Sequence, residues 1–516
     1  MADLLFNNRL FVFSIGLVLI AGSIILHVIK KEKLSVILLA AASFFLFLYA
    51  TVLCPFLNLW DERFHALVAK NLMRHPLMPT LYDDPVVNMA YDRWDRFHIW
   101  VHKQPLFLWE IMISYKIFGV NEFALRLPSA ISAALLVAAA YRSGKILRNH
   151  TAGYFTALLI ATSFCIMELV DGRRGLDHND LSFMCWISFS IWAWLEYRSS
   201  GKKWWIPVIG SLSGFAILCK WLAGLLVYLV WGACALQENK FRFKKYSDIA
   251  LALLVTITIA LPWQLLIFHW YPAEAKISYD YNLKHFLTPL DGHSGPWTYH
   301  FEMISGIYGT WAPWLILQAL FAFYWRCRDK KTAIALLSAA AFVYAFFTIT
   351  ATKMSSFTTV AALPVFLSFG FLMELFSSTW EKLRLRPFTA RAALALALLA
   401  FAYSRIDLSA FEKFHGASPP QDPCAGTLEK NRNLFKQLHL PANTVLFNVP
   451  GRHYVEAMFY SDVTAYNFIP SEEQYLALKN KHRGIAILKH PNEELPAYLT
   501  QDASVILLDI PIQQCE

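Results

Sequence analysis

Long apolar segments recur along this chain, and they constrain its fold more than any other feature. About 20 consecutive apolar residues are enough to cross the hydrocarbon core of a bilayer. The segments are continuous and show no alternation of polar and apolar residues, so we expect membrane-spanning helices and not strands. Twelve such segments lie near residues 10–29, 34–53, 127–147, 152–170, 181–197, 204–219, 221–236, 248–268, 309–325, 332–350, 356–376 and 388–405.

The composition excludes several other classes of protein. Hydrophobic residues make up 57% of the 516 residues and charged residues 16%, whereas a soluble chain has about 45–50% apolar and roughly 25% charged residues. A disordered or coiled-coil protein is excluded, and a soluble multidomain protein does not fit. The sequence therefore predicts an all-α polytopic membrane domain of about twelve transmembrane helices.

The net charge of +9 reflects membrane topology and not a nucleic-acid-binding surface. Six short connections hold 21 of the 46 Lys and Arg residues but only four of the 37 Asp and Glu residues. They occur at every second connection, and short loops rich in Lys and Arg stay in the cytoplasm. Both termini and the long intervening segments are therefore expected outside. The six connections are 30–33, 142–148, 198–203, 238–245, 326–331 and 381–391.

Three long segments are expected on the outer side of the membrane, and loops of such length indicate chemistry or recognition. We expect four parts in the chain. Residues 1–53 form an N-terminal transmembrane hairpin, and residues 54–126 form the first external loop with interfacial helices. Residues 127–405 complete the bundle and include the external loop 269–308, and residues 406–516 form a soluble domain.

The tail alternates short β-rich runs with helical patterns, which is typical of a small soluble α/β domain. Ser471 followed by Gln474 predicts a capped helix start. Cys424 and Cys515 lie in this tail, and two states stay open for them, a disulfide in an oxidising exterior or unpaired thiols. The expected strands are Thr444–Val449, Val463–Phe468, Gly484–Lys489 and Ser504–Ile510, and the expected helices are Leu428–Leu438 and Glu472–Asn480.

Two carboxylates follow the second apolar segment directly, in the run Asn58-Leu-Trp-Asp-Glu-Arg63. Carboxylates at the membrane face are costly to place and need a reason. Asp61 or Glu62 can act as a general base that deprotonates an acceptor. Alternatively, both are interfacial residues paired with Arg63, and the composition leaves the two readings open.

A second polar cluster contains His102 and Lys103, just before a stretch at Leu106–Phe118 that is too short and polar to span the membrane. This stretch is expected to form a helix in the interface. Lys103 can pair with a lipid phosphate. His102 is a candidate metal ligand, although a lone His is more often a satisfied surface residue.

Further charges gather at outer helix ends. Asp177 and Asp180 are three residues apart, so they share a face if a helix begins there, or they close a tight connection as ion pairs. Lys220 and Lys353 stand at the ends of apolar segments. They form an anion site if they converge over one cavity, or else they extend to lipid phosphates singly.

The segment 281–297 packs His285, Asp291 and His293 among helix-breaking and aromatic residues and ends at Trp297. This pattern predicts a loop at the membrane surface beside a sugar or lipid headgroup. Interfacial preference alone explains the aromatic residues, but it explains poorly why so many polar side chains are packed so closely.

Several motifs come in a familiar order. They are Asp61-Glu after an early span, Lys103-Gln-Pro-Leu, Phe-Gly-Val-Asn-Glu-Phe-Ala-Leu-Arg-Leu-Pro-Ser-Ala at 118–130, Leu-Pro-Trp at 261–263, His-Ser-Gly-Pro-Trp at 293–297 and the late Lys353. This set resembles the integral-membrane glycosyltransferases of the GT-C fold. The closest groups are the aminoarabinose transferases that modify lipid A and the protein O-mannosyltransferases. The resemblance runs from about residue 50 to 376.

The resemblance implies roles for the candidate site residues. Asp61 would activate the acceptor, with Glu62 as its acidic neighbour and Asp177 as a further functional acid. The donor phosphate would be held by Lys103 with Lys353, and we add His285 and Lys220 as further candidates. The candidate substrate-binding residues are Arg63, Asp180, His293 and Trp297.

The resemblance also implies a donor sugar on a polyprenyl phosphate and no nucleotide cofactor. The chain agrees with this because it has no Rossmann-type glycine motif. His102 falls where the aminoarabinose enzymes have a metal-binding Glu, so a divalent metal ion near His102 is a further expectation. Asn282 stands roughly where those enzymes have a His, which is a departure from their metal-binding pattern.

We therefore expect a glycosyltransferase of the bacterial inner membrane with an outward-facing site. The acceptor would be lipid A or another envelope glycolipid, and a protein hydroxyl is the alternative. A lipid or sugar transporter is a rival class, but transporters show internal repeats and charges at midmembrane depth, which this sequence lacks. A receptor whose tail binds a ligand is a third hypothesis.

Overall fold

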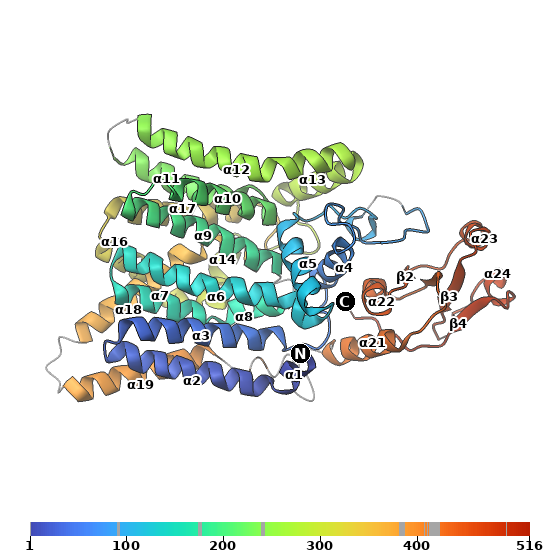
Figure 1. Cartoon of the computed structure of the whole chain (residues 1–516), viewed down its shortest axis with the longest axis horizontal. Coiled ribbons are helices and arrows are strands. Elements are labelled where there is room, and N and C mark those ends of the chain that lie inside the picture. The colour runs from blue at the N-terminus through green and yellow to red at the C-terminus, as the bar shows by residue number, and fades with distance from the viewer. Residues whose placement is uncertain are drawn as a thin grey trace.

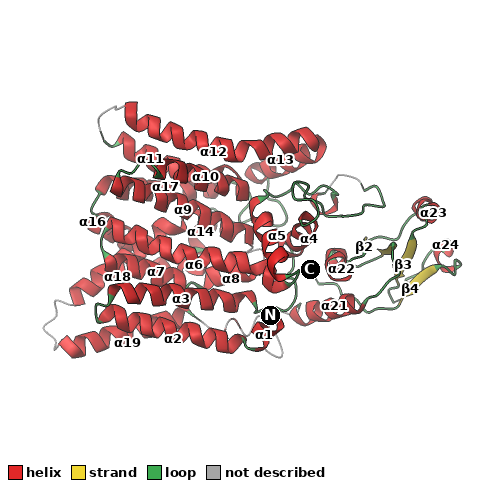
Figure 2. Cartoon of the chain, in the orientation of Figure 1, coloured by secondary structure: helices red, strands yellow, loops and turns green. Residues whose placement is uncertain are grey.

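The chain forms a bundle of long helices with a smaller α/β unit at one end (Figure 1). The computed structural model describes all residues except 1, 90–92, 174–177, 239–242, 381–386, 407, 410, 412–423, 492 and 516. Helices dominate, and the strands are confined to the C-terminal unit (Figure 2). Both marked chain ends lie between the bundle and this unit, and the turn between the first two long helices lies at the opposite end.

The bundle is held by one large apolar core that includes Leu46, Tyr154 and Phe366. Its helices are α1 (Ala2–Asn7), α2 (Arg9–Val28), α3 (Glu32–Thr51), α6 (Glu122–Leu147), α7 (His150–Ala161), α8 (Phe164–Asp171), α9 (His178–Ser200), α10 (Trp205–Lys220), η2 (Trp221–Leu225), α11 (Leu226–Leu236), α12 (Phe243–Trp270), α16 (Ala312–Arg326), α17 (Lys330–Ile349), η3 (Ser355–Ala361), α18 (Ala362–Trp380) and α19 (Pro387–Arg405).

Within the described residues, eight helical stretches are long and apolar enough to cross a membrane, or ten if each of two bent pairs is one span. The bent pairs are α7 with α8, at 46°, and 299–308 with α16, at 87°. Two differences explain why ten stretches are found where twelve segments were expected. The helix α9 is not among the apolar stretches, because charged and polar residues occupy both of its ends, and 205–236 forms one stretch.

The stretch 205–236 folds back on itself at Trp221, which has a φ of +72°. Ser213 Oγ donates a hydrogen bond to the carbonyl of Gly224 at 2.8 Å. In a continuous helix these residues would lie about 16 Å apart, at 1.5 Å per residue. The two segments expected at 204–219 and 221–236 are therefore the two arms of a hairpin.

The external pieces lie at the end of the bundle that faces the α/β unit. The first contains α4 (Asp61–Leu72), η1 (Trp94–Arg96) and α5 (Leu106–Phe118). The bounds of α5 are those expected for the interfacial helix. The second external piece contains α13 (Pro272–Leu287), α14 (Tyr299–Glu302) and α15 (Ile304–Tyr308).

The C-terminal unit is a four-stranded parallel sheet in the order β2-β1-β3-β4, flanked by helices. The strands are β1 (Thr444–Phe447), β2 (Thr464–Ala465), β3 (Gly484–Leu488) and β4 (Val505–Leu508), and the helices are α21 (Ala425–Gln437), α22 (His453–Ser461), α23 (Glu472–Asn480) and α24 (Ala497–Thr500). All four expected strands and both expected helices are present. Ser471 and Gln474 form the expected capping box, whereas α22 was not expected.

A disulfide joins Cys424 and Cys515 across 91 residues of sequence, so the first of the two states left open is the one observed. It connects the start of α21 with the C-terminal end of the tail. The other six cysteines are buried and unpaired with one another. Disulfides persist in oxidising compartments, which agrees with an external tail.

Candidate functional site

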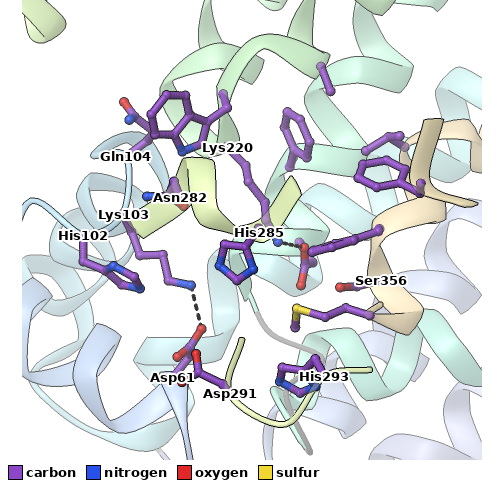
Figure 3. A pocket seen from close by; sticks show the side chains of 18 of the residues that line it. Asp61, His102, Lys103, Gln104, Lys220, Asn282, His285, Asp291, His293 and Ser356 are labelled. Carbon is purple, nitrogen blue, oxygen red and sulfur yellow. Dashed lines mark hydrogen bonds and ion pairs between the residues drawn. The ribbon is translucent and has the colours of Figure 1, made fainter. Parts of the chain in front are cut away.

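A cavity of about 1270 Å³ opens where the bundle meets its external pieces. Its walls come from the first external segment, α9, the α10–α11 hairpin, α12, α13, α17, η3 and α21 (Figure 3). One part of the wall is polar and holds Asp61, Lys103 and Lys220. The rest is apolar and includes Leu222, Phe342 and other aliphatic and aromatic side chains. Such a cavity suits a ligand with a charged head and an apolar tail.

Asp61 and Lys103 form the central polar contact of this cavity (Figure 3). The Lys103 Nζ donates to Asp61 Oδ2 at 2.7 Å, and both side chains are only about one-fifth exposed, at 19% and 22%. Burial, the largest single influence, acts to raise the pKa of Asp61, but the charge and hydrogen bond of Lys103, together with His65 and His102, hold this pKa well below its usual value. Asp61 is therefore a carboxylate at neutral pH.

The adjacent Glu62 points away from the cavity into the protein. Its carboxylate forms an ion pair with Arg126 NH2 at 2.8 Å and accepts a hydrogen bond from Asn58 Nδ2 at 2.6 Å. Glu62 and Arg126 are fully buried. Burial acts to raise the pKa of Glu62, but the charge of Arg126 and these hydrogen bonds lower it overall. Asp61 and Glu62 are neighbours in sequence with different environments.

Lys220 and Asp180 form a second ion pair in the cavity wall. The Lys220 ammonium also lies 5.4 Å from the ring centre of Phe357. Nearby, Gln264 Nε2 donates to Gln104 Oε1 at 2.7 Å, so two amides extend the polar surface from α12 to the first external segment. The helix end that carries Lys220 meets the hairpin turn at Trp221, so the fold-back places this lysine at the cavity.

His285 and His293 both line the cavity, as does Asp291, to which the Tyr281 hydroxyl donates a hydrogen bond. Burial and then the charge of Lys103 lower the pKa of His285 to about 4, so its imidazole is neutral at pH 7. His285 Nδ1 lies 3.0 Å from the Thr352 hydroxyl oxygen.

The neighbours of Thr352 determine which tautomer of His285 fits. The Thr352 hydroxyl donates to the carbonyl of Thr288 at 3.2 Å and accepts from the backbone N–H of Leu290 at 3.3 Å. The proton of this hydroxyl is thus used, and His285 Nδ1 must supply the proton in its own contact. This tautomer leaves Nε2 as a hydrogen-bond acceptor.

Besides Glu62, three expected site residues lie away from the cavity. Arg63 forms a buried ion pair with Glu456 of the C-terminal unit at 3.3 Å. Lys353 donates to the carbonyls of residues 347, 348 and 350 at 2.6–2.9 Å, so it caps the end of α17. Trp297 is 69% exposed. The expected acid Asp177 lies outside the described residues.

His102 lines the cavity, but among the described residues no set of further metal ligands gathers around it. Its ring stacks on Trp94 with a centroid distance of 4.7 Å. Burial and the charge of Lys103 lower its pKa well below the usual value. In the part of the chain that the structure describes, no group of three or more His, Cys, Asp or Glu residues gathers in a way that could hold a metal ion. These residues do not fit a metal centre, and no step below uses one.

Sequence reasoning did not single out Arg126, Gln264 or Thr352. Arg126 carried a usable signal, because it directly precedes the apolar segment 127–147, and a charge at the start of a membrane span usually has a specific partner. Gln264 follows the Leu-Pro-Trp motif directly. No sequence signal marks Thr352, whose role arises from its contact with a His that is 67 residues away.

Comparisons with known proteins match this geometry. Residues 102–265 match a family model described as dolichyl-phosphate-mannose-protein mannosyltransferase. The crystal structure of ArnT from Cupriavidus metallidurans bound to undecaprenyl phosphate superposes with a TM-score of 0.63, at 15% identity, over 86% of this chain and 88% of that one. The fold is that of the GT-C glycosyltransferases. This confirms the fold expected from the sequence motifs, and the chain is an integral membrane protein of that fold.

Two further matches cover less of the matched proteins. The archaeal oligosaccharyltransferase AglB from Archaeoglobus fulgidus superposes with a TM-score of 0.54, at 12% identity, over 84% of this chain and 64% of that one. An undecaprenyl phosphate-alpha-4-amino-4-deoxy-L-arabinose arabinosyl transferase from Pseudomonas fluorescens (strain Pf0-1) is 27% identical over 275 residues. That alignment covers 51% of this chain and 48% of the relative, so the chain spans about half the length of the curated relatives it matches.

Proposed function

We propose that this chain is a glycosyltransferase that moves a sugar from a polyprenyl-phosphate donor to an acceptor at the outer face of the bacterial inner membrane. The observation that carries this proposal is the contact between Asp61 and Lys103 in a cavity whose remaining walls are largely apolar. A carboxylate and a cation are the groups that a transfer from a lipid phosphate requires. The names of the curated relatives support the same donor class.

The reaction is a single displacement at the anomeric carbon. The acceptor oxygen forms the new bond to this carbon, and Asp61 takes the acceptor's proton. The bond between the anomeric carbon and the phosphate oxygen breaks, and its electron pair leaves with the polyprenyl phosphate. Lys103 and Lys220 supply positive charge toward that phosphate. Such electrostatic stabilisation is usually the largest contribution to catalysis.

The other cavity residues bind and orient. A neutral His285 with an accepting Nε2 suits a sugar hydroxyl, which can donate a hydrogen bond, better than a phosphate oxygen, which cannot. Asp180 fixes Lys220, and Glu62 anchors the start of α4 through Arg126. The leaving group is already a phosphate ester, so the proposed reaction needs no nucleotide cofactor.

Two acceptor classes follow from the comparisons. The sequence resemblance to the aminoarabinose transferases that modify lipid A favours lipid A or a similar envelope glycolipid, and the curated relatives carry the name of that sugar's transferase. The family model for protein mannosyltransferases favours a protein hydroxyl. Mass spectrometry of envelope lipids and of glycoproteins, from cells with and without the gene, distinguishes the two classes. A mass increment in the lipid fraction alone identifies the lipid acceptor.

The variant Asp61→Asn tests the proposed base. General base catalysis contributes about 10²–10⁴-fold, so sugar transfer in proteoliposomes should fall by that factor. Binding of the polyprenyl-phosphate donor should persist, because Asn keeps the shape of the side chain. Asp83→Asn is the matched control, since Asp83 pairs with the exposed Arg74 in the same external segment. Full transfer by the Asp61 variant would exclude Asp61 as the base.

A further inference from the structure

Arg452 of the C-terminal unit reaches the rim of the cavity. Its guanidinium carbon lies 5.3 Å from the ring centre of Trp60 and 5.4 Å from that of Trp94, and both tryptophans line the cavity. Its Nε lies 3.3 Å from a carboxylate oxygen of Asp95, which is 5% exposed. A cation held over two aromatic faces and against a buried carboxylate is well fixed.

Trp60 holds an unfavourable backbone conformation directly before Asp61. Its φ is +65°, in the region that bulky side chains rarely adopt, and it occupies the N-cap of α4 without a side-chain cap bond. Such a conformation persists only when the surrounding structure holds it. The guanidinium of Arg452 can hold Trp60 in this conformation, because it lies over the indole ring of that residue.

The helix that follows Arg452 supports α4 along its length. Arg63 in the first turn of α4 pairs with Glu456 of α22 at 3.3 Å. Lys70 in the last turn pairs with Asp462 and donates to the carbonyl of Phe459 at 2.7 Å. The C-terminal unit therefore holds both ends of the helix that begins with Asp61, and Arg452 adds a contact at the residue just before it.

We propose that Arg452 is a positioning residue, which acts from the C-terminal unit through Trp60 to fix the carboxylate of Asp61 opposite Lys103. This inference rests on the proposed function, in which Asp61 is the base. The guanidinium of Arg452 already contacts Trp60, Trp94 and Asp95. Its role is therefore to position these residues and not to contact the substrate. The soluble tail thereby completes a catalytic site that lies in the membrane domain.

The test compares Arg452→Gln with Arg452→Lys in purified full-length protein. Small displacements of a reacting group cost up to about 100-fold in rate, so kcat for sugar transfer should fall about 10-fold or more in the Gln variant. The KM for the donor should change by less than about threefold, because lysines hold the phosphate. The Lys variant keeps a cation over the rings and should recover most of the rate.

Arg483→Gln is the matched control, because Arg483 pairs with Asp84 at 2.7 Å and also joins the C-terminal unit to the first external segment. Arg483 belongs to the tail and does not line the cavity. This variant should keep the wild-type kcat. Equal losses in the Arg452 and Arg483 variants would indicate general loosening of the tail and would overturn the positioning role.

Hydrogen exchange gives a readout that does not depend on activity. Peptides that cover the first turn of α4 should exchange faster in Arg452→Gln than in wild type, and they should not do so in Arg483→Gln. Unchanged exchange in the Arg452 variant overturns the inference even if the enzyme is active. A wild-type protein that transfers no sugar would refute the proposed function, while the exchange result would still decide the positioning role.

Discussion

At the scale of single residues, the ionisation of Asp61 depends on Lys103. Burial favours the neutral acid, and the ammonium of Lys103 is the largest of several contributions that together favour the carboxylate more strongly. A lowered pKa keeps the base form present down to acidic pH, and the base form is lost only as the pH falls through that pKa. The same lysine helps to hold His285 neutral. Lys103 therefore influences the protonation of two neighbouring side chains in the cavity.

Replacement of Lys103 by Gln should change both the rate and the pH profile. Loss of one charged stabiliser of the leaving phosphate should lower kcat/KM at neutral pH by about 100-fold. Burial then dominates at Asp61, its pKa rises, and the acidic limb of the profile of kcat/KM against pH should move to higher pH. Lys103→Arg keeps the charge and should keep the limb in place. A limb that stays fixed in the Gln variant would show that Lys103 does not control Asp61.

At the scale of elements, two tertiary contacts place the cavity residues. The buried pair between Glu62 and Arg126 joins the start of α4 to α6. The reversal at Trp221 places Lys220 over the cavity and brings η2 against α10. Both contacts are made deep inside the protein, where an uncompensated charge or a steric clash is expensive. These two contacts therefore fix the positions of α4 and of the α10–α11 hairpin.

The hairpin of α10 and α11 predicts opposite effects at two glycines. A Cβ at Gly224 would lie 2.7 Å from the backbone nitrogen of Ile217, whereas a Cβ at Gly232 meets nothing within 4 Å. Gly224→Ala should therefore destabilise the protein by about 1–3 kcal/mol through overpacking. Gly232→Ala should be neutral or stabilise by up to about 1 kcal/mol, because Ala favours helix.

Thermal unfolding of the two variants in detergent, followed by the loss of monodisperse protein, checks this prediction. The Gly224 variant should lose solubility at a clearly lower temperature than wild type, and the Gly232 variant should not. Equal midpoints in the two variants would mean that 205–236 does not fold back at Trp221.

At the scale of the whole molecule, the tail is integrated with the membrane domain. The first external segment and the C-terminal unit share one apolar cluster, in which Phe64 and Trp100 belong to the same core as Phe447 and Tyr454. The tail's α21 contributes Ala425 and Leu428 to the cavity wall. A cavity built from both parts agrees with the contacts that the tail makes with α4.

The disulfide between Cys424 and Cys515 should stabilise this arrangement. The backbone N–H of Cys515 lies 3.1 Å from His453 Nε2, and His453 Nδ1 lies 2.8 Å from Glu456, so the bonded end of the chain packs against α22. A disulfide typically contributes about 2–4 kcal/mol, and more for longer loops. The double variant Cys424→Ser/Cys515→Ser should be cut faster in the tail by limited proteolysis.

Reductant provides the control for this prediction. Wild type treated with reductant should approach the proteolysis rate of the double variant, and the double variant should not respond to reductant. A wild-type tail that is indifferent to reductant would show that the disulfide does not hold the tail.

The sequence alone predicted the helical bundle, the helix 106–118 and the strands of the tail. It also named Asp61 and Lys103 as candidate residues for one reaction. Apolar run length, periodicity and motif order are local properties, so they can be read without a structure. The tertiary structure decided that Glu62 faces Arg126, that Lys353 caps a helix and that Arg63 faces the tail. The direction of a charged side chain depends on its partners, and these partners are up to several hundred residues away in sequence.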